Sequence, residues 1–180
     1  MTARRLAAIL VAGAACAGIT ACNDKEEPKV ADLDPNLTRP IAQQHVVESL
    51  TKTLQSLPAG TTFTRRSPQN ASNVLSAGTV VPCDDTDDAG PTDYAVSYFI
   101  QPNDPGIYDA VTNAWKGFGW GTREVTGAGQ TGIVANAPDG YTFGIQKNQD
   151  GNLSINGTSP CFAHPPNGDV SDAPEVIVHP

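Results

Sequence analysis

The chain has 180 residues and a formal net charge of −8, a length that suits one domain with short additional segments. Its 19 acidic residues outnumber 11 basic ones, so the surface repels nucleic-acid phosphates and anionic lipid headgroups. No basic patch offsets this imbalance, and the composition therefore argues against a nucleic-acid partner.

Residues 1–21 predict a secretory signal peptide. Arg4 and Arg5 give a positive start, and residues 6–18 are apolar or small without any charge. This run of about 13 residues is too short for a transmembrane helix, which needs about 20. A short apolar run behind a basic start directs export and is then removed. Loss of Arg4 and Arg5 lowers the net charge of the remaining chain to −10.

Cys22 is predicted to carry a lipid. Residues 19–22, Ile-Thr-Ala-Cys, resemble the lipobox of bacterial lipoproteins, in which an aliphatic and two small residues precede the modified cysteine. The resemblance implies a diacylglyceryl group on the Cys22 thiol, cleavage before Cys22 and an acyl chain such as palmitate on its amine. Two or more buried chains anchor a protein stably. The alternatives are an ordinary cleaved signal with a chance cysteine, and lipidation of Cys16, which has Gly13 at the aliphatic position.

Cys83 and Cys161 are predicted to form a disulfide bond. They remain once Cys16 is removed and Cys22 is lipidated, and an exported protein meets an oxidising compartment. Closing a loop of this length would stabilise the fold by roughly 4–5 kcal/mol. Two free thiols or a redox pair are the alternatives, although no Cys-x-x-Cys spacing supports redox activity.

Composition divides the exported chain into a tether (22–37), one domain (38–163) and a loose tail (164–180). Residues 23–37 are charged, contain two prolines and lack periodicity, which is typical of a flexible spacer. The tail is rich in Pro and Asp. Within the tail, residues 176–178 (Val-Ile-Val) could pair with a sheet edge, but the flanking prolines argue against a central strand.

The domain is predicted to begin with a helix, which has Thr38 as N-cap and Pro40 in its first turn and which ends before Pro58 and Gly60. Its apolar residues at helical spacing are Ile41, Val46, Val47, Leu50, Leu54 and Leu57. Strands follow over residues 61–66, 78–83 and 94–101, the last of which is rich in aromatic and β-branched residues.

A second helix is predicted after Asp104, its cap, running from Pro105 to Gly117. Its apolar stripe is Ile107, Val111, Ala114, Trp115 and Phe118. Four strands follow near residues 121–126, 132–136, 141–147 and 152–156, with hairpin turns at 138–140 (Pro-Asp-Gly) and 150–151 (Asp-Gly). This order predicts an α+β fold, an antiparallel sheet with two helices on one face. Cys161 would then join the end of this meander to the strand that carries Cys83.

Several features together resemble the small exported Lpp-type lipoproteins of mycobacteria and other actinobacteria. They are the lipobox, a helix after the tether, the Val-Val-Pro-Cys sequence at 80–83, a Tyr-Phe-Ile strand, a helix that ends near Trp115, and hairpin strands at 140–145 and 153–162. The likeness is one of pattern and order over residues 38–163. It implies a single α+β domain with one disulfide, in families that mostly lack an assigned activity.

Three motifs could bind a cofactor or a metal. Residues 127–132 match Gly-x-Gly-x-x-Gly, but a strand rather than a helix is predicted to follow, so a glycine-rich turn is the better interpretation. Asp84, Asp85, Asp87 and Asp88 concentrate carboxylates that hard cations prefer, yet the order of a calcium loop is missing and a solvated acidic loop is favoured. Residues 148–152 could also supply metal ligands, but a hairpin turn is the favoured interpretation. We therefore expect no cofactor and no metal.

Histidines could support catalysis. His45 lies beside the apolar stripe of the first helix, while His164 and His179 lie in the tail, and none has a metal-binding spacing. A triad of His45 with a serine and an aspartate is conceivable, but no Gly-x-Ser-x-Gly motif supports it.

Trp115, Phe118 and Trp120 form a possible ligand or partner surface. Trp115 suits the core, whereas Trp120 stands between two glycines that give it little cover. The alternative is that all three pack in the core.

The sequence thus favours a membrane-anchored envelope lipoprotein on the exported face, with a non-catalytic binding or accessory domain. Its partner would be an unknown protein or a small apolar ligand, besides the membrane that holds its lipid. The alternatives are an envelope hydrolase with an unrecognised site, and a structural or antigenic surface protein.

Overall fold

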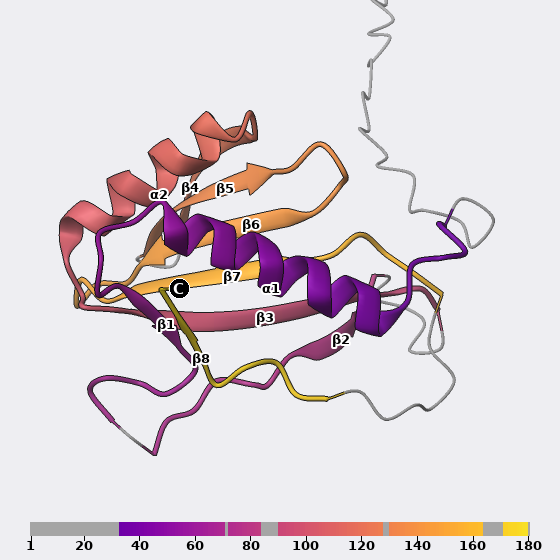
Figure 1. Ribbon diagram of the computed structural model, residues 1–180, viewed down its shortest axis with the longest axis horizontal. Helices are drawn as coiled ribbons and strands as arrows, with labels where there is room; N and C mark the ends of the chain where they lie inside the picture. Colours follow the sequence, from indigo (N-terminus) through magenta and orange to yellow (C-terminus); the bar gives the residue numbers. More distant parts are fainter. Residues whose placement is uncertain (1–32, 71, 84–89, 128–129, 164–170, 180) are drawn as a thin grey trace, which may run out of the picture.

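The computed structural model describes residues 33–70, 72–83, 90–127, 130–163 and 171–179. In chain order the elements are α1 (Arg39–Gln55), β1 (Thr62–Thr64), β2 (Thr79–Pro82), β3 (Thr92–Gln101), α2 (Pro105–Gly117), β4 (Gly121–Gly127), β5 (Gln130–Asn136), β6 (Thr142–Lys147), β7 (Leu153–Thr158) and β8 (Val176–Val178) (Figure 1). The signal peptide, Cys22, the acidic run at 84–88 and His164 lie outside the described residues. Within the described ranges, neither α1 nor α2 combines the length and the hydrophobicity of a membrane-spanning helix.

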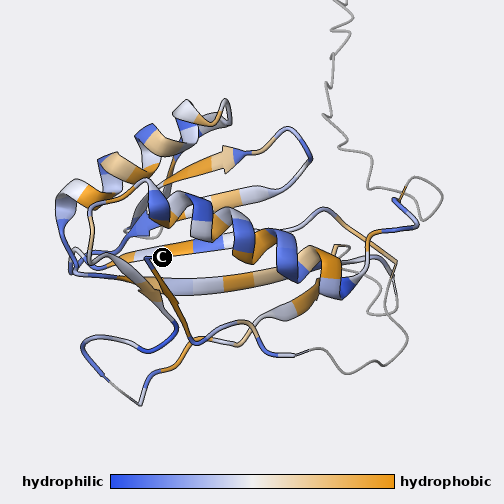
Figure 2. Cartoon of the chain, in the orientation of Figure 1, coloured by the Kyte–Doolittle hydropathy of each residue, from blue (hydrophilic) through white to orange (hydrophobic). Residues whose placement is uncertain are grey.

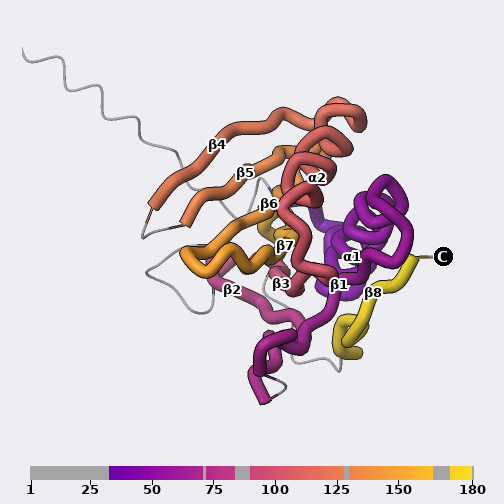
Figure 3. Tube along the Cα trace, turned by 90° about the vertical axis from the view of Figure 1, so that its left-hand side faces the viewer, coloured from indigo at the N-terminus to yellow at the C-terminus, as the bar shows by residue number. Residues whose placement is uncertain are grey.

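The strands form one antiparallel sheet in the order β4-β5-β6-β7-β3-β1-β8, with β2 also paired to β3. Both helices cover the same face of this sheet, and Figure 3 shows them as a separate layer beside the strands. Polar and apolar residues alternate along the elements (Figure 2). In β3, every second residue from Thr92 to Ile100 is buried. The predicted α+β class, with two helices on one face of an antiparallel sheet, is confirmed.

The packing of α1 on the sheet depends on a four-residue repeat and on one glycine. Ala42, Val46, Leu50 and Leu54 are fully buried, and their spacing places them on one face of the helix. A Cβ on Gly157 of β7 would lie 2.7 Å from Val46 Cγ1, so the missing side chain lets the helix approach the sheet. Val47 and Leu57, also predicted on the apolar stripe, pack against this core.

Ile41 departs from the predicted stripe. It is 50% exposed, because one position along a helix turns it about 100° from Ala42 and so places it beside the buried row. Thr38 stands at the predicted N-cap position, but its side chain makes no capping hydrogen bond.

The second helix begins and ends where the sequence predicts. The Asp104 carboxylate accepts a hydrogen bond from the Gly106 N–H at 2.8 Å, and Pro105 occupies the first turn. Ile107, Val111 and Trp115 point into the core. Gly119 then takes a φ of +78°, which a residue with a side chain rarely adopts.

The disulfide between Cys83 and Cys161 is present, with the two Cα atoms 6.3 Å apart. Cys83 directly follows β2 and Cys161 lies just beyond β7, so the bond joins the end of the meander to the strand region that precedes β3. The prediction of this pairing is confirmed.

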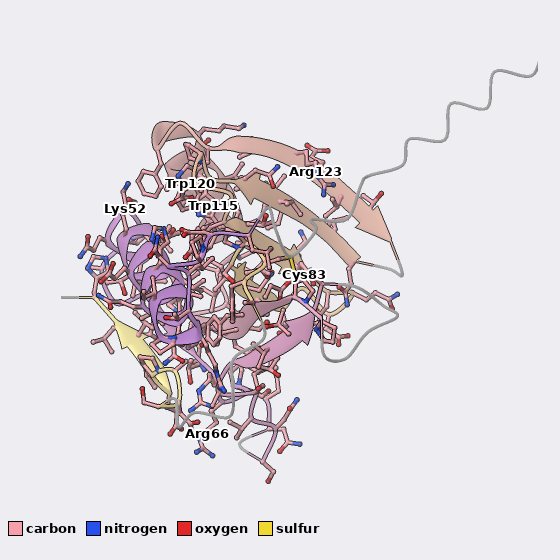
Figure 4. All side chains as sticks on the ribbon, turned by 90° about the vertical axis from the view of Figure 1, so that its right-hand side faces the viewer. Lys52, Arg66, Cys83, Trp115, Trp120 and Arg123 are labelled. Carbon is pink, nitrogen blue, oxygen red and sulfur yellow. A yellow bond between two sulfur atoms is a disulfide. The ribbon has the colours of Figure 1, made fainter. Side chains whose placement is uncertain are left out.

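The C-terminal segment differs from the predicted loose tail. Residues 176–178 form β8, which pairs with β1 at the sheet edge, as the sequence left open. The Tyr98 hydroxyl donates to the Pro174 carbonyl at 3.1 Å, and Arg66, labelled in Figure 4, pairs with Glu175 at 2.9 Å. Ala173 and Ile177 are buried. Because β8 pairs with β1 along its backbone and Ala173 and Ile177 are buried, residues 171–179 belong to the domain.

The start of the domain also lies earlier than predicted. Leu37, assigned to the tether, packs against the core, and its N–H donates to the Asp34 carbonyl at 3.1 Å. Residues 33–37 therefore form a turn against the domain rather than a free spacer.

The predicted turns of the meander are confirmed. Gly140 and Gly151 have φ values of +87° and +81°, as hairpin turns require. Gly127 pairs with Gln130 across the β4–β5 hairpin, and β5 follows directly. The Gly-x-Gly-x-x-Gly sequence is thus a hairpin connection rather than the start of a helix.

Candidate functional site

The three residues of the predicted aromatic surface, Trp115, Phe118 and Trp120, differ in how deeply they are buried. Trp115 is fully buried, and its indole N–H donates to Thr53 Oγ1 of α1 at 3.1 Å, so it offers no surface to a partner. Phe118 and Trp120 are half-buried and pack against the core. Core packing therefore explains Trp115, and the surface prediction remains for the other two rings only.

Trp120 is held by other rings. It stacks on Phe143 with the ring centroids 4.7 Å apart and meets Phe118 edge-on at 5.3 Å. Lys52 Nζ lies 4.2 Å from the centre of the Phe118 ring. Figure 4 shows Lys52 close to Trp115 and Trp120, at the C-terminal end of α1. These contacts cover much of both rings and account for them as an outer layer of the core.

A more open site lies at the other end of α1. The described residues that line it enclose about 560 Å³ and are Leu33, Asp34, Leu37, Ile41, His45, Asp139, Tyr141, Pro160 and Cys161. We call this cavity the His45 pocket. Its walls come from the turn before α1, the first two turns of α1, the β5–β6 hairpin and the chain after β7. Most of the lining is apolar, with a small polar group at one side, a combination typical of small-ligand sites.

The polar group of the pocket is an ordered pair. His45 Nε2 lies 2.9 Å from Asp139 Oδ2, and the imidazole ring stacks on Tyr141 with the centroids 4.0 Å apart. The chain positions the partners independently, because α1 presents His45 while the Pro-Asp-Gly turn presents Asp139. The imidazole is held by two contacts, one to Asp139 in the tight turn and one to the buried Tyr141 ring.

The electrostatic environment of the pocket is acidic. Burial raises the pKa of the Tyr141 hydroxyl, and the Asp139 and Asp34 carboxylates raise it further, in that order. Both carboxylates therefore act on the same ring. None of the described lining residues is a lysine or an arginine.

The pocket holds part of a catalytic set among its described residues. His45 and Asp139 have the geometry of a base and its orienting carboxylate. A triad-type hydrolase would also need a nucleophilic side chain, and the described lining residues include no serine, threonine or free cysteine, since Cys161 is bonded to Cys83. Of the other histidines, His179 places Nε2 3.2 Å from the Leu57 carbonyl oxygen. Within the described residues, no group of three or more His, Cys, Asp or Glu could hold a metal.

A second cavity, of about 630 Å³, lies between α1 and the segment before β8. Its described lining residues are Pro40, Gln43, Gln44, Val47, Glu48, Ser171, Asp172 and Pro174. The Gln43 amide donates to the Ser171 carbonyl at 2.9 Å. None of these described residues is aromatic, and we favour the His45 pocket because it combines a paired His45 and Asp139 with an apolar wall.

The sequence alone indicates His45 but does not indicate this pocket. His45 was recognised as a candidate, but its partner Asp139 is 94 residues away in a turn that was interpreted only as a hairpin signal. Ile41 carried a usable signal, since it does not fit the repeat that joins Ala42 and Val46. An apolar residue off the buried face of a helix can mark a ligand surface.

Comparisons with protein-family models, with curated proteins and with solved structures found no significant match to this chain.

Proposed function

We propose that this chain is an exported lipoprotein, anchored through a lipid on Cys22, whose domain binds a ligand in the His45 pocket without catalysing a reaction. The pocket is the observation that carries the binding role, since it combines an apolar wall with an ordered His45–Asp139 pair. The lipobox at 19–22 and the short apolar run before it support the anchor. The likeness to actinobacterial Lpp-type lipoproteins points in the same direction.

The anchor is needed because the domain has no electrostatic hold on a membrane. With a net charge of −10 after removal of the signal, the chain is repelled by anionic headgroups. In fractionated cells, the wild type should be found with the membranes and a Cys22→Ser variant should be soluble. Cys16→Ser is the matched control and should stay with the membranes. A Cys22→Ser protein that remains fully membrane-bound would overturn the anchor.

The binding role has its own experiment, on residues 22–180 carrying Cys22→Ser, which retain every described residue. The probe is N-phenyl-1-naphthylamine, a neutral apolar dye that fluoresces in apolar sites. We expect saturable binding that Ile41→Glu weakens severely, because the variant places a charge in the apolar wall. Val74→Glu is the control, since Val74 is similarly exposed but lies outside the pocket. Equal binding by both variants would contradict the assignment of the pocket.

An envelope hydrolase is the second candidate, because His45 and Asp139 form two thirds of a catalytic triad. It predicts turnover of a simple ester such as p-nitrophenyl butyrate that His45→Gln abolishes. The binding role predicts that any slow hydrolysis is the same in His45→Gln and in the wild type.

A further inference from the structure

The acidity of the His45 pocket indicates what kind of ligand it takes. Asp34 and Asp139 both line it, and among the described residues neither forms an ion pair with a lysine or an arginine. Asp139 is paired only with His45, whose side chain is 40% exposed. A ligand that brings its own positive charge would offset two carboxylates that no described lysine or arginine neutralises.

The two carboxylates are held in place before a ligand arrives. Asp34 Oδ1 accepts from the Asn36 N–H at 2.9 Å, which fixes the turn that carries Asp34. Asp139 Oδ2 engages His45, and its Oδ1 lies 3.5 Å from the Tyr141 N–H. Burial raises the pKa of the Tyr141 hydroxyl most, and the Asp139 and Asp34 carboxylates raise it further. Because the geometry is set locally, little ordering is needed when a cation binds between them.

The remaining wall is apolar and partly open. Leu33, Leu37 and Pro160 line it, and Ile41 leaves half of its surface exposed at the same site. Removing the methylene groups of a ligand from water against such a wall favours binding. The wall therefore suits an alkyl chain, while the carboxylates suit its head.

The position of the pocket along the chain fits a ligand from the membrane. Leu33, one of its walls, is 11 residues beyond Cys22. An extended chain of that length spans at most about 40 Å. If Cys22 carries the lipid, as the proposed function holds, the pocket stays within that distance of the bilayer surface, where amphiphiles are concentrated.

We propose that the His45 pocket binds a single-chain amphiphile with an ammonium head, placing the head between Asp34 and Asp139 and the chain against Leu37 and Ile41. This inference rests on the proposed function, because it names the ligand class of the same site. Binding should therefore depend on the charge of the ligand head, which a purely apolar pocket would not require.

The test compares three probes with the same alkyl chain: dodecylammonium, dodecanol and dodecanoate. The two ionic probes are kept below their micelle concentrations and dodecanol below its solubility limit. Isothermal titration calorimetry is run on residues 22–180 carrying Cys22→Ser. We expect dodecylammonium to bind most tightly and dodecanoate most weakly. The double variant Asp34→Asn/Asp139→Asn should weaken dodecylammonium by about tenfold, as two partly exposed charge pairs would, and leave dodecanol unchanged.

The matched control is Asp109→Asn/Asp150→Asn, which removes the same charge at exposed positions outside the pocket. It should bind all three probes like the wild type. If dodecanol binds as tightly as dodecylammonium, the ligand class is wrong while the pocket stands. If none of the probes binds, the ligand class and the pocket both fall. If the control double variant weakens dodecylammonium binding equally, the effect comes from net charge alone, and this result would also overturn the proposal.

Discussion

The indole N–H of Trp115 donates to the Thr53 hydroxyl at 3.1 Å, inside the interface where the two helices meet the sheet. Both residues are completely buried, and Thr53 in turn donates to the Ser49 carbonyl at 2.9 Å. The Thr53 hydroxyl thus supplies the hydrogen-bond acceptor that the buried indole N–H of Trp115 needs.

Replacement of Thr53 by valine should destabilise the domain by about 1–3 kcal/mol. The valine fills a similar volume but leaves the indole N–H buried without an acceptor. Urea unfolding followed by tryptophan fluorescence measures the difference. Thr53→Ser, which keeps the hydroxyl, is the control and should retain more stability than Thr53→Val, and the reverse order would contradict this role.

Loss of the disulfide should cost about 2–5 kcal/mol. Cys83 and Cys161 are 78 residues apart, and the bond restricts the unfolded chain over that whole length. The comparison is between the wild type and Cys83→Ala/Cys161→Ala in urea unfolding. A reductant should lower the unfolding midpoint of the wild type and leave the double variant unchanged. A wild type insensitive to reductant would count against the account.

A methyl group at position 157 should separate α1 from the sheet. Gly157→Ala places a Cβ 2.7 Å from Val46 Cγ1 and 2.9 Å from Phe143 Cε1, and such overpacking costs about 1–3 kcal/mol. Gly117→Ala is the control, because nothing lies within 4 Å of its added Cβ. Thermal unfolding should show a lower midpoint for Gly157→Ala only, and equal midpoints would argue against close helix packing at this glycine.

Asp93 should make stability depend on pH. Burial raises the pKa of its carboxyl group from an ordinary value of 3.8 to about 6, and one of its oxygens has no hydrogen-bond partner. Between these two values the folded protein binds more protons than the unfolded chain, so stability from this group falls as the pH rises from about 4 to about 6. Asp93→Asn should therefore raise the thermal midpoint at pH 7 and lose that advantage near pH 4.

The control for Asp93 is Asp150→Asn, an exposed position with the same change of charge. The difference between its midpoint and that of the wild type should vary little over the same pH range. A constant gain for Asp93→Asn at every pH would show that the carboxyl group does not titrate in this window.

Local patterns were sufficient to predict most of the fold. Asp104 with Pro105 marked the start of α2, and the Pro-Asp-Gly and Asp-Gly turns separated β5 to β7. These signals act within a few residues, so they can be recognised without knowledge of the tertiary structure. The edge strand β8 was only partly foreseen, because three apolar residues between prolines become a strand only when β1 offers an open side.

The site could be predicted only in part. His45 was visible as a candidate, yet its pairing with Asp139 depends on how α1 lies across the β5–β6 hairpin. Trp115 and Trp120 are close in sequence, but only the fold decides that one is buried and the other half-covered by Phe143. Contacts between distant segments therefore decide the site.

The anchor at Cys22 is the central claim, since the location of the domain and the source of its ligand both follow from it. The most direct measurement is the mass of the N-terminal peptide of protein extracted from the envelope of the cells that make it. We predict a peptide that begins at Cys22 and carries a diacylglyceryl group with an acyl chain on its amine. An unmodified peptide, or one that begins at another residue, would contradict the account.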